Sequence, residues 1–250
     1  MSKAFLTQLG RELGAIFMSP LAYIIFFFFT LISGIIFYQN ITFLEGFGGR
    51  FSLAQMFFLG VWFWICLLIM IPLVTMRLFS EEYKTGTIEI LLTAPVSDWD
   101  VVLAKFFGAL AFYLCLWAPS VLYLLIFQWV SDSQVPIQWP SLLLCYSMVV
   151  LVGSLFISVG LFFSSLTKSQ PLAAFMSFAT LMIYFFVGIL AFNVHNSKFS
   201  DLLSYISTYQ HMQTYLEGIF DTRPLVFYLT AAALFLALTH QILAIKKVKA

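Results

Sequence analysis

Charged residues are scarce in this chain: Asp, Glu, Lys and Arg make up 9% of its 250 residues, and 62% are hydrophobic. A soluble domain carries roughly 25% charged residues. The composition therefore excludes a soluble globular fold and predicts an integral membrane protein. The three cysteines all fall inside apolar runs and lack metal-ligand spacing, which favours apolar packing roles over a metal site.

Motifs for nucleotide binding and hydrolysis are also absent. The sequence contains no Gly-x-x-x-x-Gly-Lys-Ser/Thr phosphate loop, no His-Glu-x-x-His and no Gly-x-Ser-x-Gly. No basic cluster with interleaved aromatic residues suggests nucleic-acid binding. No Asp, Glu, Lys or Arg lies deep in an apolar run, where proton-driven transporters usually place one. The chain is therefore not expected to be an enzyme or to bind a cofactor, and energy for transport is expected to come from a partner.

Six charge-poor runs are present, and a transmembrane helix needs about 20 such residues. They lie near residues 20–38, 53–75, 101–129, 141–166, 171–193 and 224–245. The runs predict an all-α integral membrane protein with six transmembrane helices, organised as a single domain over residues 1–250.

Two flanking segments show helical periodicity without being long apolar runs. Residues 1–19 place one set of apolar residues on one helical face: Leu6, Leu9, Leu13, Ile16 and Phe17. Their polar residues lie largely elsewhere: Lys3, Gln8, Arg11 and Glu12. This pattern predicts an amphipathic helix on the membrane surface, with a frayed tail as the alternative.

Residues 194–223 carry apolar side chains at three- and four-residue steps, which predicts one or two helices partly embedded in the outer leaflet. A folded surface loop is the alternative. This outer helical segment also contains His195 and His211.

The distribution of Lys and Arg predicts the orientation, because cytoplasmic loops carry the excess. With a cytoplasmic N-terminus, nine of the 12 basic residues lie inside: Lys3, Arg11, Arg77, Lys84, Lys105, Lys168, Lys246, Lys247 and Lys249. The other three lie outside: Arg50, Lys198 and Arg223. An even number of spans then places both termini and residues 76–100 in the cytoplasm.

Residues 76–100 form the most charge-dense segment between two apolar runs. Arg77 and Glu81 are four residues apart and share a helix face. Gly86 can take the left-handed conformation that ends a helix. The segment therefore begins with a short helix that is expected to lie in water and to contact another molecule.

A second short helix is predicted after Gly86. Thr87 supplies an N-cap hydroxyl, Glu89 lies near the positive end of the helix, and Pro95 ends it. The alternative is a solvated loop that only joins two spans.

The stretch that begins at Arg77, RLFSEEYKTGTIEILLTAPVS, resembles the cytoplasmic loop of ABC-transporter permeases of the ABC-2 export type. It is especially similar to the gliding-motility permease group and to permeases of copper-enzyme maturation operons. The matching residues follow the second of six spans: Glu81, Glu82, Gly86, Thr87, Glu89, Leu91, Leu92 and Pro95. The similarity extends to the amphipathic start with Ser19-Pro20 and to the outer segment, so nearly the whole chain fits.

The resemblance implies a permease subunit of an ATP-driven exporter in the bacterial cytoplasmic (inner) membrane. It implies a dimer with a second permease subunit, identical or related, each docked on a separate ATP-binding cassette ATPase subunit that carries ATP and Mg. Residues 76–100 would then be the coupling segment, with these site residues: Arg77, Leu78, Phe79, Glu81, Glu82, Tyr83, Lys84, Gly86, Thr87, Glu89 and Pro95.

Within that segment, the apolar residues Leu78, Phe79 and Tyr83 are expected to anchor in a groove of the ATPase, because buried aromatic anchors dominate interfaces. The charged residues Glu81, Glu82 and Lys84 are expected as rim contacts. Three other functions stay open: a subunit that passes force to a periplasmic partner, a membrane scaffold or assembly protein, and, third, an intramembrane protease.

Overall fold

The computed structural model describes residues 3–46, 52–88, 96–130, 138–190 and 203–249. Within these ranges the regular structure is helical, without strands: α1 Lys3–Phe17, α2 Pro20–Gly46, α3 Leu53–Phe58, α4 Val61–Thr75, α5 Ser80–Thr85, α7 Asp98–Val130, α8 Trp139–Leu166, α9 Gln170–Leu190, α11 Thr208–Leu216 and α12 Thr222–Lys249. Six segments are long and apolar enough to cross a membrane: Pro20–Phe43, Val61–Thr85, Asp98–Val130, Trp139–Leu166, Gln170–Leu190 and Thr222–Lys247. The predicted all-α membrane fold with six spans is confirmed.

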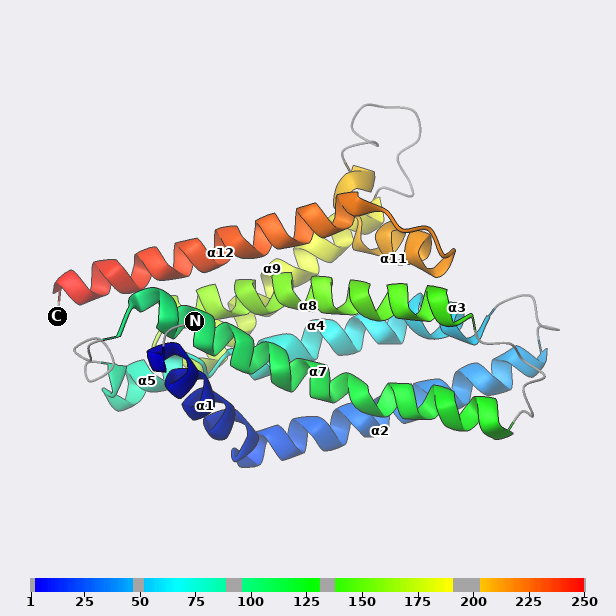
Figure 1. Ribbon diagram of the computed structural model, residues 1–250, viewed down its shortest axis with the longest axis horizontal. Helices are drawn as coiled ribbons and strands as arrows, with labels where there is room; N and C mark the ends of the chain where they lie inside the picture. The colour runs from blue at the N-terminus through cyan, green and yellow to red at the C-terminus, as the bar shows by residue number, and fades with distance from the viewer. Residues whose placement is uncertain (1–2, 47–51, 89–95, 131–137, 191–202, 250) are drawn as a thin grey trace.

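The spans form an elongated bundle whose two ends differ (Figure 1). One end, which we call the α5 end, holds α1, α5 and both chain termini. The opposite end, which we call the α11 end, holds α3 and α11. Helix α8 is central and packs against α4, α7, α9, α11 and α12. The segment predicted to contact a partner therefore lies at the same end of the bundle as the amphipathic α1.

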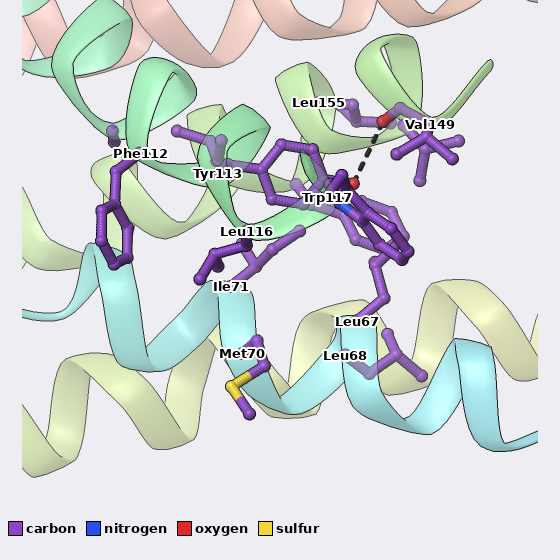
Figure 2. Close-up of a cluster of buried hydrophobic side chains, with 14 of the residues drawn as sticks. Leu67, Leu68, Met70, Ile71, Phe112, Tyr113, Leu116, Trp117, Val149 and Leu155 are labelled. Carbon is purple, nitrogen blue, oxygen red and sulfur yellow. Dashed lines mark hydrogen bonds between the residues drawn. The ribbon is translucent and has the colours of Figure 1, made fainter. Parts of the chain in front are cut away.

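The middle of the bundle is a close-packed core of aliphatic and aromatic side chains (Figure 2). The Tyr113 hydroxyl of α7 crosses this core and donates to the Val149 carbonyl of α8 at 3.1 Å. Two glycines of α8 make the close approach possible. A Cβ at Gly153 would lie 2.2 Å from the Tyr113 ring, and a Cβ at Gly160 would lie 2.1 Å from Thr75 Oγ1 of α4. Small residues thus bring α4 and α7 directly onto α8.

The predicted span at residues 53–75 is not one continuous helix, because it breaks at Leu59 and Gly60 into α3 and α4. Ser52 and Gln55 begin α3 with a reciprocal capping box. Gly60 has an extended backbone, and a Cβ there would lie 2.7 Å from the Met56 carbonyl oxygen. The break buries Phe57, Phe58 and Phe63 as a cluster of edge-on rings. These tertiary contacts override the apolar periodicity on which the prediction rested.

Helix α1 is present, but its faces are used differently from the prediction. Gln8 and Glu12 are buried against the bundle, whereas Leu6 and Phe17 are exposed. The helix packs mainly on α7, where Phe5 meets the ring of Phe107 edge-on. Two of the predicted polar residues, Gln8 and Glu12, therefore face the protein, where Glu12 meets a charged partner, and part of the apolar stripe faces outward.

The described part of the outer segment is helical at residues 203–206 and in α11, and residues 217–221 are not helical. The buried face of α11 contains Met212 and Tyr215 and packs on α8, α9 and α3. His195 and the start of the predicted outer helix lie outside the described residues. Ile219 and Phe220, just beyond α11, are exposed. Embedding in the outer leaflet stays a prediction.

Candidate functional site

Residues 76–79 form a turn between α4 and α5, and Ser164 of α8 holds this turn in place. The Ser164 hydroxyl donates to the Met76 carbonyl at 3.1 Å. It accepts the backbone N–H groups of Phe79 at 3.0 Å and Ser80 at 3.2 Å. The first N–H groups of a helix have no partner within the helix. One buried hydroxyl of a central span therefore fixes the start of α5.

The local features predicted for this turn are confirmed. Arg77 forms a bidentate ion pair with Glu81, with Nε to Oε2 at 2.7 Å and Nη2 to Oε1 at 3.0 Å. Its Nη1 also donates to Ser19 Oγ at 2.7 Å, which ties the turn to the α1–α2 junction. Gly86 ends α5 with φ of 76°. Apart from its chain neighbours, no atom of the described residues lies within 4 Å of a Cβ placed there, so a side chain at this position is opposed by backbone conformation and not by space.

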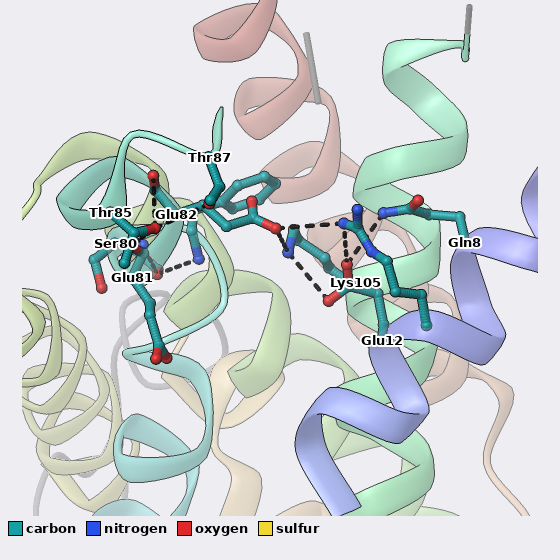
Figure 3. A network of polar contacts seen from close by, with 11 residues as sticks. Gln8, Glu12, Ser80, Glu81, Glu82, Thr85, Thr87 and Lys105 are labelled. Carbon is teal, nitrogen blue, oxygen red and sulfur yellow. Dashed lines mark hydrogen bonds and ion pairs between the residues drawn. The ribbon is translucent and has the colours of Figure 1, made fainter. Parts of the chain in front are cut away.

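A buried ionic cluster joins α5 to α1 and α7 (Figure 3). Lys105 Nζ of α7 contacts Glu12 Oε2 of α1 at 3.1 Å and Glu82 Oε1 of α5 at 2.8 Å. Arg11 contacts the same two carboxylates, at 3.0 and 3.4 Å. Gln8 donates to Glu12 at 3.1 Å. Two carboxylates from different helices therefore share one lysine.

The charges of this cluster are buried, because Lys105 is only 2% exposed and Glu12 is 5% exposed. Removing an ion from water costs several kcal/mol unless partners compensate, and removing one partner leaves the others uncompensated. Lys105 also lies over the Phe79 ring at 5.1 Å from its centroid. The arrangement makes the position of α5 depend on α1 and α7 together.

The apolar residues of the segment lie inside this arrangement. Phe79 is completely buried, and Leu78 and Tyr83 are nearly so. Lys246 Nζ of α12 lies 3.8 Å from the Tyr83 ring centroid and donates to the Ser165 carbonyl at 2.7 Å. Helix α5 is therefore seated on α7, α8 and α12 as well as tied to α1.

A family model described as ABC-2 family transporter protein matches residues 9–245, a range that contains α5, the first five spans and all but the last two residues of the sixth. The chain belongs to the ABC-2 transporter family. It is accordingly a multi-pass membrane permease of the ABC transporter class. No curated protein matches the chain.

In this ABC-2 permease, a short stretch at the end of α5 and just after it faces away from the bundle. Lys84, Thr85, Gly86 and Thr87 are exposed. The Thr85 hydroxyl donates to the Glu81 carbonyl at 2.9 Å and lies 2.9 Å from the Thr87 hydroxyl. These residues, 84–87, form what we call the exposed edge of α5. Glu81 is partly exposed beside it.

The expectation that Leu78, Phe79 and Tyr83 present apolar anchors to a partner is wrong for this structure, because all three side chains are buried within the permease itself. Glu82, expected at a rim, instead pairs inward with Lys105. Glu89, Pro95 and most of the predicted second short helix lie outside the described residues. The exposed edge and the buried residues of α5 therefore have separate roles.

Sequence reasoning missed Lys105, Glu12 and Ser164 as parts of the site. Lys105 entered only the count of basic residues that set the orientation. A signal was nevertheless present, because Gln8 and Glu12 are four residues apart on a helix and Lys105 lies two turns inside a long apolar helix. A buried lysine needs a carboxylate partner. The identity of that partner depends on contacts between distant segments.

A second polar cluster lies at the α11 end, and its hydrogen-bonding groups are uncharged. His211 Nδ1 of α11 is 3.2 Å from the Tyr228 hydroxyl of α12. Thr208 donates to the Tyr184 hydroxyl of α9, which in turn donates to the Ile206 carbonyl, both at 3.0 Å. Burial lowers the pKa of His211 to about 4, although a nearby carboxylate, that of Asp221, opposes the shift in part. His211 is therefore neutral at pH 7.

Proposed function

We propose that this permease is the transmembrane subunit of an ATP-driven exporter and that a separate ATP-binding cassette ATPase docks on the exposed edge of α5. Membership of the ABC-2 family supports the proposal, and so does the lack of a phosphate-loop motif in the sequence, since ATP and Mg would then bind to the partner chain. The observation that carries it is the seating of α5. Residues 84–87, at the end of α5 and just after it, face outward. Phe79, Glu82 and Tyr83 contact four different helices, α1, α7, α8 and α12.

Movement of the exposed edge would reach the spans by two routes. The first runs through Phe79, which is buried and whose backbone N–H is held by Ser164 of α8. The second runs through Glu82 and Lys105 to α7 and, through Glu12, to α1. Because protein interiors are close-packed, a displaced buried side chain must move its neighbours. Docking at a small surface would in this way shift three helices together.

The α5 end is assigned to the cytoplasm in this proposal. Both termini lie at that end together with α5, and nine of the 12 basic residues are expected there. Impermeant cysteine labelling of Lys84→Cys provides the check. Labelling is expected only after the membrane is opened, and labelling from outside intact cells would reverse the assignment.

The assembly proposed here is a dimer of six-span units, each with its own ATPase, in the bacterial cytoplasmic membrane. A function like that of the gliding-motility permease group remains a hypothesis, supported by the residues of the loop at 77–88. In the described part of that loop, Glu81 and Glu82 lie on α5, and Gly86 and Thr87 follow directly after it.

A bulky substitution on the exposed edge tests the docking surface. Thr87→Trp places a large side chain on the exposed edge, and Gln213→Trp is the matched control on an exposed position of α11 at the opposite end. Thr87→Trp is expected to lower co-purification of the ATPase at least about fivefold and to lower ATP turnover in reconstituted vesicles, because a steric block prevents close packing. Equal ATPase recovery with both variants would exclude the exposed edge as the docking surface.

A further inference from the structure

A cavity of about 210 Å³ lies at the α5 end, between α1, α2, α4, α5 and α7. Part of its wall is apolar, with residues of α2 and α4 that include Leu21, Ile25, Leu73 and Val74. Another part carries three carboxylates and two cations: Glu12, Glu81, Glu82, Arg77 and Lys105. A wall with both characters is suited to an amphiphile, because each half of such a molecule finds a matching surface.

The cavity adjoins a corner of the protein that is apolar and exposed. Ser19 lines the cavity, and the preceding residue, Met18, is 82% exposed at the junction of α1 and α2. Phe17 is exposed beside it. In a protein with six membrane-spanning helices, an apolar corner of this kind is matched by lipid and not by water. The cavity is therefore placed to receive a molecule from the adjacent leaflet.

Both an anionic and a cationic side chain of the wall have hydrogen-bonding groups that the described residues do not use. Oε1 of Glu82 accepts hydrogen bonds from Lys105 and Arg11. Its Oε2 is buried and accepts no hydrogen bond from any described residue. Arg77 uses three of its N–H groups on Glu81 and Ser19. A guanidinium has five N–H donors, so two remain. Arg77 thus offers donors for an anion, and Glu82 has an unused oxygen that a turn of its carboxylate would bring to the cavity for a cationic donor.

The charges around the cavity also balance. The three lining carboxylates face Arg77 and Lys105, and Arg11 adds a third cation through its contacts with Glu12 and Glu82. A ligand with a net negative charge gains little from such a wall. A zwitterion that carries an ammonium and a phosphate matches it at both positions.

We propose that this cavity binds the headgroup of an aminophospholipid, with phosphatidylethanolamine as the type. The ammonium would donate to Glu82 Oε2, the phosphate would accept from the remaining N–H groups of Arg77, and the chains would lie along α2 and α4. A hydrogen bond between two charged groups is among the strongest that proteins form. The site goes beyond the proposed coupling function, because it depends on neither ATP nor the partner ATPase.

The chemistry predicts which lipids are rejected. Phosphatidylcholine has the same net charge, but its trimethylammonium has no N–H to donate to Glu82. Phosphatidylglycerol brings a negative charge and no ammonium at all. Discrimination between the two zwitterions therefore reports the hydrogen bond to Glu82, whereas discrimination against phosphatidylglycerol reports the charge balance.

Native mass spectrometry of the delipidated full-length chain, titrated with each lipid of matched acyl chains, tests the proposal. Phosphatidylethanolamine is expected to bind at least about tenfold more tightly than phosphatidylcholine, as for one charge-assisted hydrogen bond. Glu82→Gln should remove most of this preference, and Glu217→Gln, the same change at the α11 end, should leave it intact. Ala15→Phe, on an exposed wall residue, should weaken binding of both lipids by filling the cavity.

Three results would overturn the proposal. One is equal binding of phosphatidylethanolamine and phosphatidylcholine by the unmodified chain. Another is a preference retained in Glu82→Gln together with unchanged binding of both lipids by Ala15→Phe, so that the test does not depend on the folding of a single variant. The third is displacement of the lipid by equimolar soluble phosphoethanolamine, because the site would then bind a free phosphoamine and not a membrane lipid.

Discussion

The two ends of the bundle satisfy their buried polar groups in different ways. At the α5 end, Lys105, Glu12 and Glu82 form a charged cluster that joins three helices distant in sequence. At the α11 end, His211 and Tyr228 belong to an uncharged network that joins α9, α11 and α12. Each end thus ties a short helix to the spans, one by ion pairs and the other by neutral hydrogen bonds.

The difference matters because a neutral network and an ionic cluster respond differently to displacement. A neutral hydrogen bond contributes about 1 kcal/mol to the stability of the fold, and that contribution is lost when the bond breaks. A buried ion that loses its partner is destabilised by several kcal/mol, so it favours any geometry that restores pairing. Since Arg11 and Lys105 both contact Glu82, this carboxylate can change partner while it stays paired. The α5 end is therefore suited to movement, and the α11 end to a fixed position.

The largest predicted effect comes from removing the shared cation. Lys105→Met should destabilise the protein by about 3–5 kcal/mol, because Glu12 and Glu82 are left buried without their main partner. Thermal unfolding in detergent measures the effect. Lys84→Met, at an exposed position of α5, is the matched control and should change stability by less than about 0.5 kcal/mol. Similar melting temperatures for the two variants would contradict a buried ionic cluster.

A neutral deletion at the α11 end should have a smaller effect. Tyr228→Phe removes one hydroxyl that lies 3.2 Å from His211 and should cost about 1–3 kcal/mol, because it leaves a buried partner unsatisfied. Tyr205→Phe, on an exposed side chain nearby, is the control. The contrast between the two ends fails if Tyr228→Phe destabilises the protein more than Lys105→Met.

The stability that His211 provides at the α11 end is also expected to depend on pH. The folded-state pKa of His211 is lowered to about 4, below its ordinary value of 6.5, so the unfolded chain binds the extra proton first. Stability from this residue is present above pH 6.5 and is lost as the pH falls toward 4. From pH 7 to pH 5.5 the loss should be about 1 kcal/mol. Comparing unfolding of the unmodified chain and His211→Gln across that interval isolates it from the carboxylates, and identical pH profiles would refute it.

The smallest predicted effect comes from replacing either of two glycines that have a positive φ, Gly86 at 76° and Gly218 at 80°. Alanine at either position should cost about 1 kcal/mol of stability, because an L side chain is strained there. A Cβ at Gly218 would also lie 3.2 Å from Ser141 Oγ, so that variant should be slightly less stable. Only Gly86→Ala should reduce transport per ATP hydrolysed in vesicles. Equal coupling in both variants would remove Gly86 from the proposed mechanism.

The features that the sequence predicts correctly are local ones. Six spans follow from run length, the Arg77–Glu81 pair follows from four-residue spacing, and the end of α5 follows from the conformational freedom of Gly86. Each depends on residues within a few turns of one another. For the same reason, the short helix α5 was expected although the surroundings of its side chains were not.

The features that sequence reasoning misplaces depend on contacts between distant segments. The break at Gly60 reflects packing of phenylalanines from two helices. The burial of Glu12 reflects Lys105, which is 93 residues away in sequence. Phe79 was expected to face a partner, because a single sequence does not distinguish an apolar residue buried by another protein from one buried by its own chain. Amphipathic patterns show which residues need cover without showing what provides it.

The glycines of α8 have a consequence for how the chain is made. Thr75 and Tyr113 fit against Gly160 and Gly153, and both side chains precede α8 in the sequence. A ribosome synthesises the chain from its N-terminus, so α4 and α7 exist before the helix that accommodates them. Until α8 arrives, the Tyr113 hydroxyl lacks the Val149 carbonyl to which it donates in the finished protein. Insertion of the fourth span thus completes a core that its predecessors cannot close by themselves.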